Sequence, residues 1–328
     1  MSKVNIKRPI IYWIALVALL TGRADAAWHR GAEAIMGTQV TVELWHTDAE
    51  HAERLIDRVM AEMHRIDQTY SPYIESSQLS VLNRGAASAP VKVSEEMWRL
   101  LQAGREMSEL SDGAFDLTYA SVGRYYDYRA GQRPSENKIA EDLAAIDYRH
   151  IVFGDGRQVR YLHPAVYVDL GGIAKGYAVD QSIELLEQAG VEQAIVAAGG
   201  DSRILGDRLG KPWSVGVQHP RDKTKMIAVL PLIDTAVSTS GDYERFFEEQ
   251  GVRYHHILDP GSGDSARGLR SVTILGPRGT FTDALSTAVF VLGVDAGLAL
   301  IDRLPGIDAI VVDSAGELRY SADIAPLD

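Results

Sequence analysis

Residues 168–180 read VDLGGIAKGYAVD, and this stretch decides how the middle of the chain folds. Its glycines and Lys175 invite comparison with a phosphate-binding loop, in which backbone N–H groups and a lysine surround an anion. The spacing fits neither the P-loop pattern G-x-x-x-x-G-K-[ST] nor the dinucleotide pattern G-x-G-x-x-G. Asp169 ends an apolar run, and a helix is expected from about Ala174. The stretch therefore predicts a strand, a turn and a helix whose N-terminus carries partial positive charge.

The N-terminus has the composition of a secretory signal peptide. Basic residues come first, an apolar run follows from Ile10 to Leu20, and Ala24-Asp25-Ala26 has the small-residue pattern of a cleavage site. The run is shorter than the roughly 20 apolar residues that span a bilayer, which disfavours the alternative of an uncleaved anchor. We therefore expect residues 1–26 to be a signal peptide, residues 27–328 to form one domain, and the mature protein to be periplasmic.

The mature chain is acidic, and the sequence contains no cysteine. Cleavage after Ala26 would remove four basic residues and one acidic residue, which takes the formal net charge from −12 to −15. An acidic balance argues against nucleic-acid binding, which needs a basic face. The lack of cysteine excludes thiol chemistry, cysteine metal ligands and a lipid anchor on a cysteine. Any anionic ligand must therefore be bound by locally placed cations or by a metal ion.

Helix and strand patterns alternate along the chain without fixed-period repeats. Helices are predicted over 49–67, with Asp48 at the N-cap position, over 94–110, and over 174–189, ending at Gly190. Strands are predicted over 38–45, 166–170, 193–198, 213–218, 227–233, 271–275 and 307–312. Several of these strands lie too close together for crossover helices, so we expect an α+β fold with an antiparallel or mixed sheet. The segment 129–148 is expected to be a surface insertion that turns helical.

Residues 280–293, TFTDALSTAVFVLG, combine oxygen side chains with a later apolar helix. Asp283 and Thr287 share one helix face, and two oxygen ligands one turn apart suit a hard cation such as Mg²⁺. The alternative is structural: Thr282 or Asp283 caps the helix, and the hydroxyls pack behind it.

Residues 254–264, YHHILDPGSGD, place two histidines before a glycine-rich turn. One of the two, His255 or His256, is expected to face whatever the turn borders, and histidine suits proton transfer near neutral pH. The alternative is again a structural histidine. Neither this cluster nor the one around Asp283 is decisive by itself.

The order of several motifs along the chain is more specific than any one of them. These motifs are MGT (36–38), SPYIESSQLSVLN (71–83), SDGAFD (111–116), DLGGIAKGYAVD (169–180), AGGDSRILG (198–206), STSGDYERFF (238–247), HILDP (256–260) and TDALSTAVFVLG (282–293). In this order they resemble the ApbE family of FAD:protein FMN transferases. The resemblance covers nearly the whole mature chain.

The resemblance implies a T-fold-like α+β domain with a smaller appended region. It also implies an enzyme that cleaves the pyrophosphate of FAD, transfers FMN to a serine or threonine of a target protein through a phosphoester bond, and releases AMP. Matching positions place around FAD Met36, Tyr73, Ala114, Phe115, Asp116, Asp169, Lys175 and Ile257. The metal, Mg²⁺ or alternatively Mn²⁺, would be held by the backbone carbonyl of Gly172 and by Asp283 and Thr287, with His256 as catalytic base.

The glycine-rich loop can be interpreted in the light of this resemblance. Gly172 would turn a carbonyl oxygen towards the metal, Asp169 would hold the nucleobase side of FAD, and Lys175 would neutralise phosphate. Expected partners are FAD and exported or membrane-bound redox proteins with a serine or threonine flavinylation motif. Two alternatives remain: a periplasmic protein that binds or carries FAD without transferring it, and a metal-dependent FAD pyrophosphatase that releases FMN and AMP.

Overall fold

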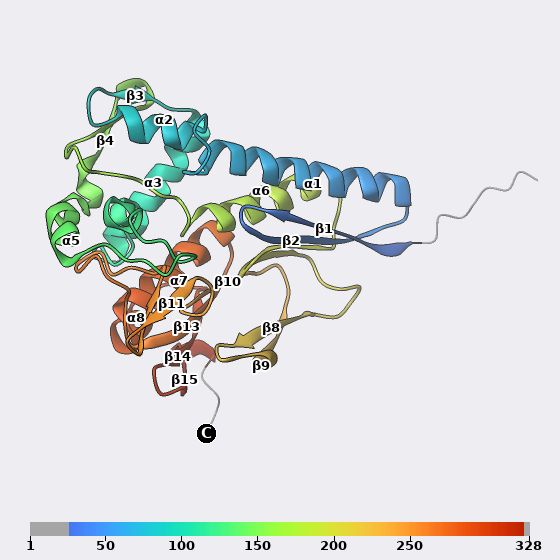
Figure 1. The fold of residues 1–328 in the computed structure, drawn as a ribbon. Coiled ribbons are helices and arrows are strands. Elements are labelled where there is room, and N and C mark those ends of the chain that lie inside the picture. The colour runs from blue at the N-terminus through green and yellow to red at the C-terminus, as the bar shows by residue number, and fades with distance from the viewer. Residues whose placement is uncertain (1–25, 325–328) are drawn as a thin grey trace, which may run out of the picture.

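The computed structural model describes residues 26–324, and its centre is an open sheet of eight strands (Figure 1). The strand order is β1-β2-β6-β7-β10-β13-β14-β15, and neighbouring strands are antiparallel. The strands are β1 (Ala27–Ile35), β2 (Thr38–His46), β6 (Ala194–Ala198), β7 (Asp201–Leu205), β10 (Ala236–Gly241), β13 (Leu269–Gly276), β14 (Asp308–Asp313) and β15 (Leu318–Tyr320). The α+β class and the antiparallel sheet are therefore confirmed.

The remaining strands form smaller sheets outside the main one. They are β3 (Val91–Lys92), β4 (Ile151–Gly154), β5 (Gln158–Tyr161), β8 (Trp213–His219), β9 (Asp222–Leu232), β11 (Phe246–Glu249) and β12 (Val252–His255). In Figure 1 the region of β3, β4 and α5 lies at the far end of the molecule from the β1–β2 hairpin. It forms the smaller appended region expected from the family resemblance.

Helices cover the main sheet and connect it to the appended region. They are α1 (Ala49–Tyr70), α2 (Gln78–Gly85), α3 (Glu95–Leu110), α4 (Ala120–Gly123), α5 (Glu136–Asp142), α6 (Ala174–Gln188), α7 (Gly279–Leu292) and α8 (Val294–Ile301). Helix α1 begins as predicted, since the side chain of Asp48 accepts a hydrogen bond from the backbone N–H of His51. Its apolar stripe is buried in the core, as the spacing indicated. No helix in residues 26–324 has the length and apolarity that crossing a membrane requires.

Helices α6 and α7 pack with their backbones close together. A Cβ atom on Gly176 would collide with the carbonyl oxygen of Gly279, so only glycine permits this approach. Asp180 of α6 then caps α7, because its carboxylate accepts hydrogen bonds from the N–H groups of Gly279 (2.7 Å) and Thr280 (2.9 Å). Helix α7 begins at Gly279, so the idea that Thr282 or Asp283 caps it is wrong.

The strand predicted over 166–170 is wrong, although the segment precedes the glycine-rich loop as expected. The side-chain amide of Asn83 takes the place of a partner strand: it donates to the carbonyl of Val168 (2.8 Å) and accepts from its N–H (2.9 Å). The N–H of Asp169 donates to the carbonyl of Leu117 (3.0 Å). These partners satisfy the backbone groups of Val168 and Asp169 without a strand ladder, so the β-branched segment is not a strand.

The other predicted elements have counterparts in the structure. The helices over 94–110 and 174–189 correspond to α3 and α6, and Gly190 follows the end of α6 with a φ of 84°. The other predicted strands match β2, β6, β8, β13 and β14 within two residues at each end, whereas β9 begins five residues earlier than predicted, at Asp222. The segment 129–148 contains α5, and few of its residues are buried, as expected of an insertion. The predicted signal peptide lies, apart from Ala26, outside the described residues.

Candidate active site

The glycine-rich loop follows the segment held by Asn83 and leads into α6. The carboxylate of Asp169 folds back and accepts a hydrogen bond from the N–H of Gly171 (2.6 Å). Burial raises the pKa of Asp169, while the hydrogen bond from Gly171 and the charge of Arg245 lower it. The turn and the helix start at Ala174 are where the sequence placed them. Asp169 is therefore a partly buried acid at the start of the loop that leads to the positive end of α6 at Ala174.

A cluster of three charged side chains lies beneath the loop. The ammonium of Lys175 contacts Oδ2 of Asp201 (2.6 Å) and Oδ1 of Asp283 (3.6 Å). Asp201 and Asp283 are 2% and 3% exposed. Burial opposes the charge on Lys175, but the two carboxylates outweigh burial and raise its pKa. For Asp283, burial and repulsion from Asp201 raise the pKa above its ordinary value. One ammonium thus serves two buried carboxylates, which leaves one negative charge without a cation when both acids are ionised.

The three expected metal ligands lie together. Asp283 and Thr287 share one face of α7, and a Cβ on Gly172 would lie 3.4 Å from Oγ1 of Thr287. Among residues 26–324 there is no group of three or more His, Cys, Asp or Glu side chains that could hold a metal. A site here must therefore use hydroxyl, carbonyl and water oxygens beside few carboxylates, which is the donor set that Mg²⁺ takes. The residues present fit that ion.

His256 and His255 point into different surroundings. His255 is buried and structural: its Nε2 lies 2.9 Å from the carbonyl of Ala266, and its ring packs edge-on against Phe290. The Nδ1 of His256 is buried and has no hydrogen-bond partner among the described residues. Burial, which is the largest cause, and the charges of Arg245 and Lys175 together lower the pKa of His256 to about 3. His256 is therefore a neutral imidazole with a free nitrogen beside the charged cluster.

The β1–β2 hairpin turn brings Met36 to the same end of the sheet. Met36 and Gly37 have φ values of 55° and 70°, which is the geometry of a tight two-residue hairpin turn. A positive φ is strained for methionine, and such strain is concentrated at functional sites. A Cβ on Gly37 would lie 3.9 Å from Nη2 of Arg245, so that arginine borders the turn.

The other residues expected to contact FAD differ in whether their side chains are already bound by the protein. Phe115 is buried against the loop, since a Cβ on Gly172 would lie 3.1 Å from its ring, and Ala114 directly precedes it. The carboxylate of Asp116 is instead held by the protein, because it accepts from the N–H and hydroxyl of Thr118 (2.7 and 2.6 Å) and from the N–H of Tyr148 (2.7 Å). Ile257 is buried directly after His256 and accepts a hydrogen bond from the N–H of Ala266.

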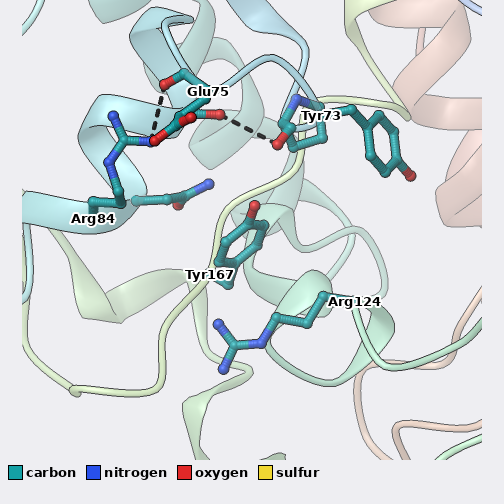
Figure 2. A pocket seen from close by; sticks show the side chains of 8 residues that line it. Tyr73, Glu75, Arg84, Arg124 and Tyr167 are labelled. Carbon is teal, nitrogen blue, oxygen red and sulfur yellow. Dashed lines mark hydrogen bonds between the residues drawn. The ribbon is translucent and has the colours of Figure 1, made fainter.

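Tyr73 lies at the surface, 86% exposed, on the rim of a cavity of about 430 Å³. Figure 2 shows its ring pointing away from Arg84, Arg124 and Tyr167, which line the other side of the cavity. The guanidinium of Arg124 stacks 5.0 Å from the ring centre of Tyr167. Tyr73 is thus free to lie over a planar ligand, while the cavity is walled by polar and cationic groups.

Three site residues were missed in the sequence: Asn83, Asp201 and Arg245. Each lies inside a motif quoted above, but no local pattern distinguishes a site residue from its neighbours there. The two glycines before Asp201 predict a turn, but not which group its carboxylate faces. Arg245 could not be placed without the hairpin that positions it.

Comparison with known proteins shows what this arrangement resembles. The model of the ApbE family matches residues 36–311. The FAD:protein FMN transferase of Treponema pallidum (strain Nichols) is 32% identical over 346 residues, covering 97% of this chain and 96% of the relative. That of Klebsiella pneumoniae (strain 342) is 31% identical over 90% of this chain and 93% of the relative.

Two solved structures extend the likeness to the fold. The ApbE protein of Thermotoga maritima has a TM-score of 0.84 and 35% identity, covering 90% of this chain and 98% of that one. The apo form of the Pseudomonas stutzeri flavinyl transferase ApbE has a TM-score of 0.80 and 30% identity, covering 90% and 95%. The fold is thus that of solved flavin transferases. The chain belongs to the ApbE family, as the order of its motifs indicated.

Proposed function

We propose that this protein is an FAD:protein FMN transferase that moves FMN from FAD to a serine or threonine hydroxyl of a target protein. Relatives that cover nearly all of the chain carry this name. We assign the reaction to the Asp169 loop, the Asp283 face of α7 and His256; the loop contacts Thr287 of α7, and the N–H of Gly176 donates to Asp283.

One observation carries the proposal: the buried Nδ1 of His256 has no partner among the described residues, and it lies near the charge of Lys175. A buried polar atom without a partner costs stability, so its retention indicates a ligand or a reacting group. The imidazole is neutral at physiological pH and can accept the proton of a hydroxyl nucleophile.

The transfer exchanges one bond at phosphorus for another. The acceptor oxygen forms a bond to the phosphorus on the FMN side of FAD, and the bond from that phosphorus to the bridging oxygen breaks. The bridging oxygen leaves on AMP, and the hydroxyl proton goes to His256. No water is consumed. If water takes the place of the hydroxyl, the same site is a pyrophosphatase, so the acceptor decides between these two activities.

Mg²⁺ belongs to this proposal, and Asp283, Thr287 and the carbonyl of Gly172 are the residues that would hold it. When bound, a divalent ion neutralises the charge that develops on phosphate oxygens. The carboxylate of Asp283 would supply the negative charge for such an ion, and Gly172 adds no side chain to the space beside Thr287.

We also propose that the protein is exported and acts on exported redox proteins. The predicted cleavage after Ala26 falls immediately before β1, which begins at Ala27, so cleavage leaves the main sheet intact. N-terminal sequencing of the protein from a periplasmic fraction should give Ala27, whereas recovery of only an intact Met1 form in the membrane would contradict export.

The reaction is tested with the mature protein, FAD, Mg²⁺ and an exported acceptor that carries a serine or threonine flavinylation motif. We expect a fluorescent flavin band on the denatured acceptor and one AMP per flavin attached. His256→Ala should slow transfer by roughly 10²–10⁴-fold while FAD still binds. His64→Ala removes an exposed histidine that pairs with Glu33 and serves as the control.

The outcomes separate the candidate functions. AMP with only free FMN would favour the pyrophosphatase. Tight FAD binding without AMP, across several acceptors, would favour a flavin carrier and contradict the transferase.

A further inference from the structure

The charged cluster limits which residue can neutralise the pyrophosphate of FAD. Lys175 was expected to do so, but its ammonium lies 2.6 Å from Asp201 and 3.6 Å from Asp283, and both acids are buried. Turning Lys175 towards a phosphate would leave the carboxylate of Asp201 buried without a cation, which is unfavourable. The positive charge of Lys175 is therefore already paired with carboxylates of the protein itself.

Arg245 has the opposite character. It is exposed, and within residues 26–324 its guanidinium takes part in no hydrogen bond or ion pair. Its position is nevertheless fixed by the backbone: its carbonyl accepts a hydrogen bond from the N–H of His256 (3.1 Å), and its Nη2 borders the Met36–Gly37 turn. The charge of Arg245 reaches Asp169, Lys175 and His256, because it shifts the pKa of each. Within the described residues it is thus an exposed cation without a side-chain partner, next to His256 and the Met36–Gly37 turn.

We propose that Arg245 binds the pyrophosphate of FAD and stabilises the charge that develops there during transfer. This inference rests on the proposed function and changes the assignment of the phosphate-binding residue from Lys175 to Arg245. A guanidinium presents a planar fork of donors that matches two phosphate oxygens at once, which an ammonium cannot do. Binding beside His256 would place the cation on the same side as the proton acceptor.

The first test measures binding and does not depend on turnover. The affinities for FAD and for riboflavin, which has no phosphate, are measured from flavin fluorescence for the wild type and for Arg245→Ala. We expect FAD to bind about 10-fold more weakly to the variant and riboflavin to bind equally to both. Equal loss for both ligands would mean that Arg245 supports the flavin pocket structurally, and no loss for FAD would mean that it does not touch the pyrophosphate; either result overturns the proposal.

The second test measures AMP release from FAD. We expect Arg245→Ala to slow it by about 10²-fold and Arg245→Lys, which keeps the charge but loses the fork, to fall between that and the wild type. Arg133→Ala is the matched control, because Arg133 pairs with Glu249 of the same β11–β12 hairpin and carries the same charge. Should Arg245→Ala fail to fold, the lysine variant decides: wild-type FAD affinity and wild-type AMP release would overturn the proposal.

The experiments distinguish a failure of the proposed transferase function from a failure of the inference about Arg245. If the wild type binds FAD but releases no AMP under any condition, the proposed function fails, and the comparison of FAD with riboflavin still decides the role of Arg245. If the wild type transfers FMN and Arg245→Ala does so at the same rate and with the same FAD affinity, only the inference about Arg245 fails.

Discussion

Helices α6 and α7 each supply an aspartate that holds the start of the other helix, and the two aspartates differ in how well they are satisfied. Asp180 of α6 accepts three hydrogen bonds from Gly279 and Thr280 of α7 and has two arginines 3.8 Å away. Asp283 of α7 accepts one hydrogen bond, from the N–H of Gly176 (2.9 Å), and shares Lys175 with Asp201.

The difference between the two aspartates separates structure from function. A buried carboxylate with a full set of donors and nearby cations stabilises the fold and has nothing left to offer a ligand. A buried carboxylate short of positive charge is a place where a bound cation would complete the balance. Both residues are 3% exposed, so burial by itself does not distinguish them.

The strongest test of this comparison is Asp283→Asn. The amide oxygen can still accept the hydrogen bond from Gly176, so the fold should be kept while the charge is lost. We expect Mg²⁺-dependent AMP release to fall at least about 10³-fold, because the only carboxylate of the proposed ligand set is gone. Thermal unfolding and Mg²⁺ titration calorimetry report on folding and binding. A folded variant with full activity at limiting Mg²⁺ would give Asp283 the same structural role as Asp180.

Asp180→Ala should have the opposite signature. Its removal leaves three donors of Gly279 and Thr280 unpaired and takes a carboxylate from beside Arg203, whereas Arg278 keeps Glu184, so we expect the free energy of unfolding to fall by about 3–5 kcal/mol. The folded fraction should keep most of its activity per molecule. Urea unfolding with activity normalised to folded protein measures both. Unchanged stability with lost Mg²⁺ affinity would reverse the roles of the two aspartates.

His255 extends the comparison to a buried histidine, whose neutral ring has its hydrogen-bond partner in the carbonyl of Ala266. Its pKa is lowered to about 4, mainly by burial and also by the charges of Arg267 and Arg253, although the hydrogen bond to Ala266 and the charge of Asp242 raise it. The unfolded chain binds this proton near pH 6.5, so stability is present above pH 6.5 and is lost as the pH falls towards 4, by at most about 3 kcal/mol. His255→Gln, whose amide can donate to Ala266, should flatten this part of the pH profile in urea unfolding. An unchanged profile would contradict it.

A contact between two site residues could be predicted from the sequence only where both residues lie on the same helix or strand. Periodicity placed Asp283 and Thr287 on one helix face correctly, because a helix fixes that relation locally. It failed at 166–170, where Asn83 replaces a partner strand from 85 residues away. The ion pair between Lys175 and Asp201 forms because the β6–β7 turn packs against the start of α6. Residue spacing in the sequence does not predict such packing.

The smallest effect should come from Thr287→Ala. Thr287 would offer the ion a neutral oxygen, and its Oγ1 already lies 3.3 Å from Oγ of Ser240, so its loss removes one weak ligand and leaves the carboxylate of Asp283 in place. We expect the Mg²⁺ concentration for half-maximal AMP release to rise about fivefold, which is about 1 kcal/mol, with little change at saturating Mg²⁺. Thr287→Ser keeps the hydroxyl and should restore the wild-type value. If the alanine variant needs no more Mg²⁺ than the wild type, the hydroxyl serves only to pack against Ser240, and the cation would have to be held by Asp283 without it.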